Sequence, residues 1–125
     1  KWHYICEQLI QSDKTYEEIW QMPLAKLDHV NRAALEWVLT MREGMAQQRR
    51  YPEAMHRISY ERLLENPQLQ LKRLQAWCGW EPDPVITDYA SKRLYVNTNR
   101  DWPQLDPRVD SLFRETMTQL GYKTS

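Results

Sequence analysis

The stretch "RISYERLLENPQLQLKRLQAWCGWEPDP", from Arg57 to Pro84, joins two kinds of local pattern. Its first residues continue an alternation of side chains that permits one short strand near residues 55–60. After the break at Asn66-Pro67, apolar residues recur every three or four positions, as on the buried face of a helix. Gly79 then stands where a helix ends in the left-handed conformation. The stretch therefore predicts a strand, a break and a capped helix over residues 67–78.

The start of that helix is repeated twice further along the chain. Asp83-Pro84 and Asp106-Pro107 follow the design of Asn66-Pro67, in which a side-chain acceptor precedes a proline. The missing proline amide costs nothing at the first helical position, because no carbonyl is available to it there. The last of these starts predicts a helix over residues 107–120 that ends at Gly121.

A long helix is predicted upstream, from about Leu24 to Gln48, because its apolar residues form one continuous stripe. We expect Trp37 and Met41 to be buried within that stripe. Two shorter helices are predicted before it, and Ser12 or Asp13 can cap the second of them. In total we expect about five or six helices with about one short strand.

Composition limits the classes of function. The chain has 125 residues and 42% hydrophobic residues, which predicts one compact domain. Lysine plus arginine equals aspartate plus glutamate at 17 each, and the sequence has no basic stripe, so we expect no nucleic-acid partner. No apolar run approaches the length of a membrane span. Cys6 and Cys78 lie far apart and fit two reduced, mostly buried thiols, so we expect a soluble, cytoplasmic protein.

The sequence offers no recognisable catalytic or metal-binding motif. The three histidines, His3, His29 and His56, have no spacing to a carboxylate or cysteine that indicates a metal site, and we expect no metal. The three glycines, at positions 44, 79 and 121, lie outside any run that cradles a phosphate.

Tryptophan is frequent, with six in the chain. Trp37 and Trp77 have helical spacing and are interpreted as core residues, whereas Trp80 and Trp102 lie in connections and are candidates to line a pocket. Residues 91–105 are polar and have no helical period. Such a segment is either a place of ligand contact or an ordinary surface connection.

Residues 54–122 resemble the C-terminal part of sulfotransferases that use 3′-phosphoadenosine 5′-phosphosulfate (PAPS). In that family a strand leads into Tyr-Glu-Asp-Leu, then Asn-Pro or Asp-Pro, then a helix. Here the pattern is Tyr60-Glu61-Arg62-Leu63 followed by Asn66-Pro67, with arginine in place of the usual aspartate. The closing segment, from Trp102 to Tyr122, is also similar to the end of the family's domain.

The resemblance implies a fold and a set of ligands. It implies that the chain is the C-terminal portion, residues 1–125, of a single α/β three-layer, P-loop-like sulfotransferase domain. The chain would be mainly α-helical, and its strand would join a sheet supplied by the missing N-terminal half. The nucleotide donor PAPS and an acceptor bearing a hydroxyl or amine are the implied substrates.

The resemblance also implies which residues contact the nucleotide. Tyr60 matches the family tyrosine that lies near the adenine, and a phenol face can stack on a purine. A tyrosine merely packed between strand and helix is the alternative. The family's late polar and basic residues make Asn97, Thr98, Asn99 and Arg100 further candidate contacts.

The family's phosphosulfate-binding loop and catalytic base belong to its upstream half, and no such motif is present in these residues. We therefore expect the chain alone to be catalytically incomplete. A non-catalytic helical protein-interaction module is the competing hypothesis, because capped helices of this kind occur in many proteins.

Overall fold

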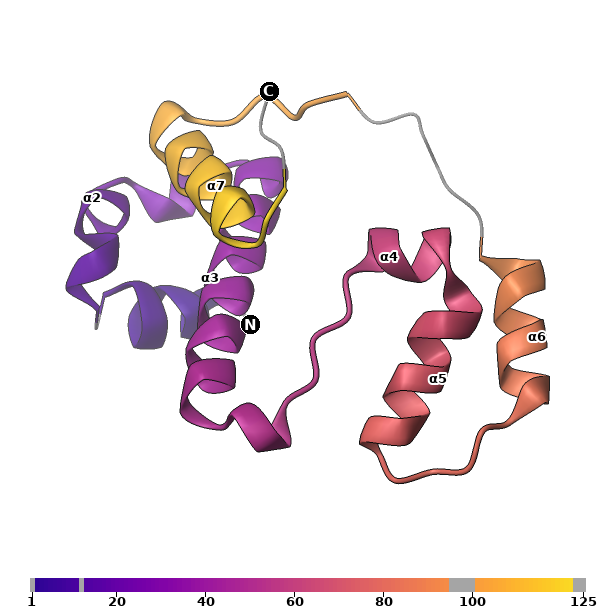
Figure 1. The fold of residues 1–125 in the computed structure, drawn as a ribbon. Helices are drawn as coiled ribbons and strands as arrows, with labels where there is room; N and C mark the ends of the chain where they lie inside the picture. The colour runs from indigo at the N-terminus through magenta and orange to yellow at the C-terminus, as the bar shows by residue number, and fades with distance from the viewer. Residues whose placement is uncertain (1, 12, 95–100, 123–125) are drawn as a thin grey trace. The chain divides into compact units, whose positions relative to one another are not determined.

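The computed structural model describes residues 2–11, 13–94 and 101–122, and it is mainly helical (Figure 1). The chain divides into two compact units. The first unit comprises Lys1–Ala46 and Trp102–Ser125, and the second comprises Gln47–Asp101. No helix in the described part of the chain combines the length and the apolar character that crossing a bilayer requires.

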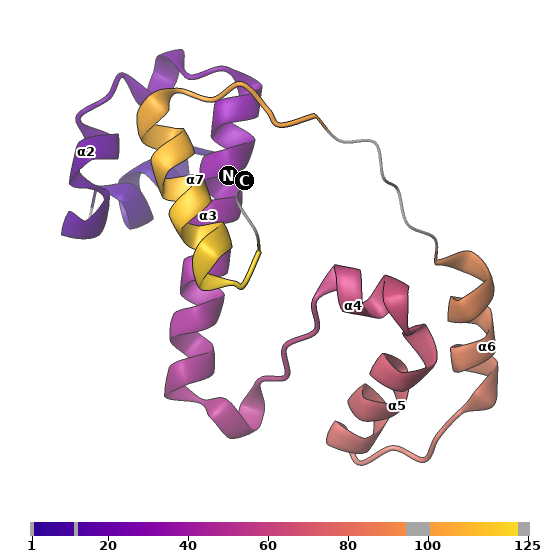
Figure 2. The same ribbon diagram turned by 45° about the horizontal axis from the view of Figure 1, so that its top comes forward.

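The first unit is built on α3 and α7. Its short elements are α1 (Trp2–Tyr4), the π-helical segment η1 (Ile5–Ile10), the 3₁₀ turns η2 (Lys14–Tyr16) and η3 (Leu24–Lys26), and α2 (Glu17–Trp20). The long helix α3 (His29–Arg50) begins in this unit, and α7 (Pro107–Gln119) lies beside it in both ribbon views (Figures 1 and 2).

The hydrophobic core lies within this unit. Its most deeply buried apolar side chains come from four elements and are Ile10, Ile19, Leu35, Val38 and Val109. Burying a side chain of this size contributes about 1.5–3 kcal/mol relative to leaving it exposed. The buried apolar cluster of the described residues therefore belongs to the first unit.

The long helix starts later than the sequence predicts. Leu27 is extended, and the Asp28 side chain caps the helix by accepting a hydrogen bond from the Asn31 amide at 2.8 Å. Trp37 is only partly buried, with its ring 4.8 Å from that of Phe113, and Met41 is also only partly buried. The deepest positions of the helix are Leu35 and Val38 instead.

The second unit contains the 3₁₀ turn η4 (Pro52–Ala54) and three helices, α4 (Tyr60–Glu65), α5 (Pro67–Trp77) and α6 (Pro84–Arg93). Helices α5 and α6 run side by side in both ribbon views (Figure 2). Among the described residues of this unit only Gln75 and Thr87 are buried, and neither is hydrophobic. This unit therefore lacks, in its described part, the apolar core that the first unit has.

The prediction of a strand near residues 55–60 is wrong, and the predicted α/β three-layer architecture is wrong with it. Met55 and Ser59 are extended, but among the described residues no strand forms, so this segment has no ladder partner for its backbone groups. Tyr60 is the first residue of a helix because the Ser59 hydroxyl accepts a hydrogen bond from the Arg62 amide and caps α4. An extended run alone cannot distinguish an unpaired segment from a strand.

The predicted helix boundaries that depend on local signals are confirmed. Asn66, Asp83 and Asp106 each cap a helix that begins with proline. Gly79 and Gly121 have positive φ angles of 71° and 88°, which is the left-handed conformation expected of them. Asp13 caps the short turn η2 through the Thr15 amide.

Candidate functional site

Tyr60 is the one predicted contact residue that the described structure includes. It occupies the first position of α4, and 51% of its surface is exposed. A phenol ring at a helix start, with half of its surface accessible, can offer a face to a planar ligand. The described geometry therefore leaves one part of the ring accessible to a ligand, and the contact with a nucleotide stays a prediction.

The backbone position of Tyr60 is fixed by hydrogen bonds at both ends of α4. The Ser59 hydroxyl accepts from the Arg62 amide at 3.3 Å, and the Ser59 carbonyl accepts from the Leu63 amide at 3.0 Å. At the other end the Asn66 amide donates to the Arg62 carbonyl at 3.0 Å, and the Asn66 side chain caps α5. The backbone of Tyr60 is thus held at the point where the extended segment ends and the first of two consecutive helices begins.

An aromatic pair, His56 and Trp77, lies in the same unit. The His56 and Trp77 rings are 5.4 Å apart between centroids, tilted by 31°. Trp77 is 44% exposed, so its expected role as a core residue is wrong. The helical period placed it on the apolar face of α5, but in the described structure its ring packs beside His56 and remains partly open to solvent.

Asn97, Thr98, Asn99 and Arg100 lie outside the described residues. The chain is described again from Asp101, and the next residue, Trp102, is firmly held. The Trp102 indole donates to Asp110 at 3.0 Å, and the Arg114 guanidinium lies over the Trp102 ring at 4.2 Å. The hydrogen bond from Arg114 holds the pKa of the Asp110 carboxyl below its usual value, and the indole hydrogen bond lowers it further.

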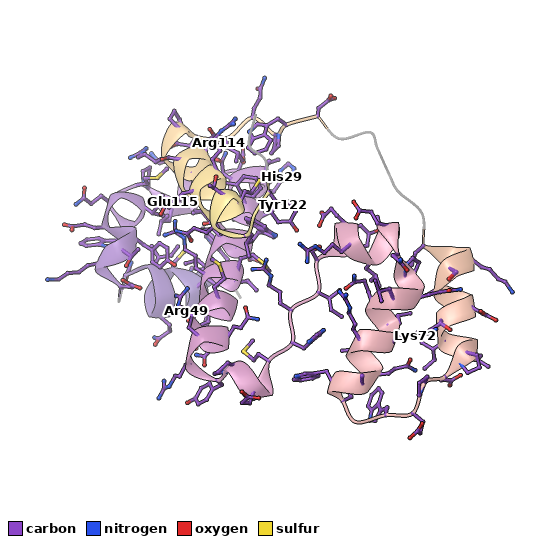
Figure 3. The ribbon with its side chains drawn as sticks, viewed as in Figure 1. His29, Arg49, Lys72, Arg114, Glu115 and Tyr122 are labelled. Atoms are coloured by element: carbon purple, nitrogen blue, oxygen red, sulfur yellow. The ribbon has the colours of Figure 1, made fainter. Side chains whose placement is uncertain are left out.

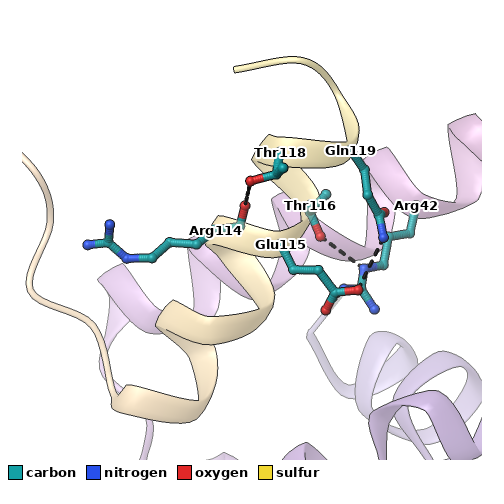
Figure 4. A network of polar contacts seen from close by, with 6 residues as sticks. All are labelled: Arg42, Arg114, Glu115, Thr116, Thr118 and Gln119. Carbon is teal, nitrogen blue, oxygen red and sulfur yellow. Dashed lines mark hydrogen bonds and ion pairs between the residues drawn. The ribbon is translucent and has the colours of Figure 1, made fainter. Parts of the chain in front are cut away.

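A polar network that sequence patterns did not indicate joins α3 to α7 (Figure 4). Arg42 donates to the buried Thr116 hydroxyl at 2.9 Å and to Glu115 at 3.0 Å, and Gln119 donates to the same Glu115 carboxylate. Arg42 also lies over the Tyr16 ring, and burial raises the pKa of the Tyr16 phenol. Arg42 lies 74 positions before Thr116 and 73 before Glu115, so no local spacing could have predicted that they meet.

The described residues also form a hollow between α5 and α6. Gln68 and Lys72 line it from α5, and Asp83, Thr87 and Asp88 line it from the start of α6. Neither Trp80 nor Trp102 lines this hollow, although both were candidates to line a pocket. Among the residues described, no group of three histidine, cysteine, aspartate or glutamate side chains is arranged to hold a metal ion.

Comparison with known proteins gives one finding. A family model described as "Sulfotransferase family" matches residues 6–84, which is more than half of the chain and includes the Tyr60 segment. The match begins far upstream of the resemblance noted at residues 54–122, and it does not reach the last helix. No curated protein and no solved structure matches the chain.

Proposed function

Because the chain belongs to a sulfotransferase family, we propose that it takes part in transferring a sulfuryl group from PAPS to an acceptor that bears a hydroxyl or an amine. Family membership supports sulfotransfer in general. The donor is proposed because PAPS is the sulfuryl donor typical of sulfotransferases. In the transfer, the acceptor oxygen or nitrogen forms a bond to sulfur while the bond from sulfur to the phosphate oxygen breaks. The acceptor proton passes to a base, and adenosine 3′,5′-bisphosphate leaves.

The proposed role of this chain is to hold the adenosine end of the donor through Tyr60. The observation that carries this proposal is the half-exposed Tyr60 ring at the capped start of α4, within the matched residues. The Ser59 cap fixes the backbone from which the Tyr60 ring projects, so that backbone need not be ordered when the ring stacks on adenine. Asn97, Thr98, Asn99 and Arg100 are proposed as further contacts on the family resemblance alone, and an arginine there would suit a phosphate group.

We further propose that the 125 residues form the C-terminal portion of a sulfotransferase domain and do not catalyse transfer alone. The glycines support this proposal. Gly44 lies inside α3, and Gly79 and Gly121 follow α5 and α7 in the left-handed conformation. None of them belongs to a loop whose backbone amides could surround a phosphosulfate.

Calorimetric titration of the complete enzyme with adenosine 3′,5′-bisphosphate tests the role of Tyr60. Tyr60→Ala should weaken binding by about 1–3 kcal/mol, the range for a base stacked on an aromatic side chain. Tyr60→Phe keeps the ring and should retain most of the affinity.

Tyr89→Ala is the matched control, because Tyr89 is 64% exposed on α6 in the same unit. Unchanged affinity of Tyr60→Ala, in a variant whose circular dichroism spectrum matches the parent, would remove Tyr60 from the proposed site.

The second candidate, a non-catalytic interaction module, is favoured by the apolar surface of the second unit. Exposed large hydrophobic side chains on or next to α5 and α6 include Leu69, Trp77, Trp80, Val85 and Ile86. A complete protein that binds no adenosine 3′,5′-bisphosphate and transfers no sulfuryl group would favour this candidate over the enzyme.

A further inference from the structure

The hollow between α5 and α6 has a size suited to a small ligand. Its volume is about 370 Å³, close to the lower end of the range for small-molecule sites. Two prolines, Pro82 and Pro84, form part of its wall beside the charged side chains. Lys72, one of its charged residues, is on α5 beside α6 in Figure 3.

Opposite charges line the hollow from its two sides. Lys72 comes from α5, whereas Asp83 is the N-cap of α6 and Asp88 lies within α6. No residue in the described ranges forms an ion pair or hydrogen bond with Lys72 or with the Asp88 side chain. One Asp83 oxygen caps α6 by accepting from the Val85 amide at 2.8 Å, and its other oxygen is available. The hollow thus presents a cation and two carboxylates that do not neutralise one another directly.

These charges select among ligand classes. A simple anion would meet Lys72 but would lie near two carboxylates, and a simple cation would meet the carboxylates but lie near Lys72. A ligand carrying both an ammonium and an anionic group satisfies both sides at once. The Thr87 hydroxyl is not an available donor, since it is buried and donates to the Pro84 carbonyl at 3.0 Å.

We propose that this hollow binds a small zwitterion of the amino-acid class. Its ammonium pairs with Asp83 and Asp88, and its carboxylate or other anionic group pairs with Lys72. Such a ligand bridges α5 and α6, the two helices that supply the only buried residues, Gln75 and Thr87, among those described in the second unit. The site is separate from the proposed nucleotide contact at Tyr60 and does not depend on sulfuryl transfer.

The test is a titration of the ¹⁵N-labelled chain, observed by NMR, with glycine, β-alanine, 4-aminobutyrate and 6-aminohexanoate. At least one of these should shift the amide signals of residues 68–72 and 83–88 in a saturable way. Butyrate and butylammonium, which carry one charge each, should bind at least about tenfold more weakly than the best zwitterion, because each loses one charged hydrogen-bonded contact.

Two variants distinguish specific binding in the hollow from weak association of a ligand with exposed surface charges. Lys72→Gln and Asp83→Asn should each weaken binding by about tenfold or more, and asparagine preserves the cap of α6. Lys92→Gln is the matched control, because Lys92 is exposed on α6 and does not line the hollow. Absence of saturable shifts with all four zwitterions, equal binding of a singly charged compound, or unchanged affinity of Lys72→Gln would each overturn the proposal.

Discussion

Asn31 joins the starts of two helices that are far apart in the sequence. Its side chain donates to Asp28 at 3.0 Å at the start of α3, and its carbonyl oxygen accepts from the Asp106 amide at 2.8 Å at the start of α7. The residue is buried, and both polar atoms of its side chain are paired. A single amide therefore sets where α7 begins against α3, and it does so without any signal in the local sequence.

At the residue scale, the hydrogen bonds to the Asp110 carboxylate predict that the stability of the fold depends on pH. Arg114 donates to its carboxylate at 2.7 Å and Trp102 at 3.0 Å, which lowers its pKa in the folded state. The unfolded state binds its proton more readily, near the ordinary pKa of about 3.9. The stabilisation is therefore fully present above that value and is lost as the pH falls through the lowered folded pKa.

Urea titrations of the parent and of Asp110→Asn, followed by tryptophan fluorescence, measure this effect. The free-energy difference between the two proteins should be constant above about pH 5 and should shrink below about pH 4. Asp88→Asn is the control, because no described residue pairs with the Asp88 side chain. A difference that does not change between pH 7 and pH 3 would contradict the assigned role of the Asp110 charge.

At the scale of elements, the glycines predict two opposite effects of the same substitution. Gly44 lies in the interior of α3, where an added Cβ would meet no heavy atom within 4 Å apart from its chain neighbours and the backbone of its own helix, whereas Gly121 has a φ angle of 88° after α7. Gly44→Ala should stabilise the protein by about 0.5–1 kcal/mol through helix propensity. Gly121→Ala should destabilise it by about 1–2 kcal/mol, the cost of the left-handed conformation for a residue with a Cβ.

Urea unfolding followed by circular dichroism gives both values in one series. The two substitutions add the same methyl group, so each is the control for the other. Destabilisation by Gly44→Ala, or a neutral Gly121→Ala, would mean that the helix ends differ from those described.

The elements also explain how much could be predicted from the sequence. Caps such as Asn66 and Asp83 were predictable because donor and acceptor lie within three residues of each other. Whether residues 55–60 form a strand could not be predicted, because a strand needs a partner strand and local alternation does not specify one. Tyr60 was identified by a motif and not by its surroundings. The Arg42 network depends on the packing of α7 against α3, which no periodicity reveals.

At the scale of the whole molecule, the two units differ in how their side chains are buried. The hydrophobic core belongs to the first unit, and in the second unit the only described residues that are buried are Gln75 and Thr87. Units with few buried apolar contacts open at a lower free-energy cost than units with a core.

Hydrogen exchange measured by mass spectrometry should therefore show unequal protection. The amides of α3 before Gln47 and those of α7 should exchange more slowly than those of α5 and α6 under native conditions. A chain that unfolds in one cooperative step would instead give the same protection in all four helices. This result would contradict the claim that the two units differ in their free energy of opening.

The most direct test of the central claim is sulfuryl transfer from radiolabelled PAPS to a panel of hydroxyl and amine acceptors. We predict that these 125 residues alone transfer nothing, because their glycines build no phosphosulfate cradle. The same residues joined to the phosphosulfate-binding part of the domain should transfer the label and should bind adenosine 3′,5′-bisphosphate less tightly when Tyr60 is replaced by alanine. Turnover by the 125 residues alone would contradict the proposed incompleteness, and inertness of the complete protein with every acceptor would contradict the sulfotransferase assignment itself.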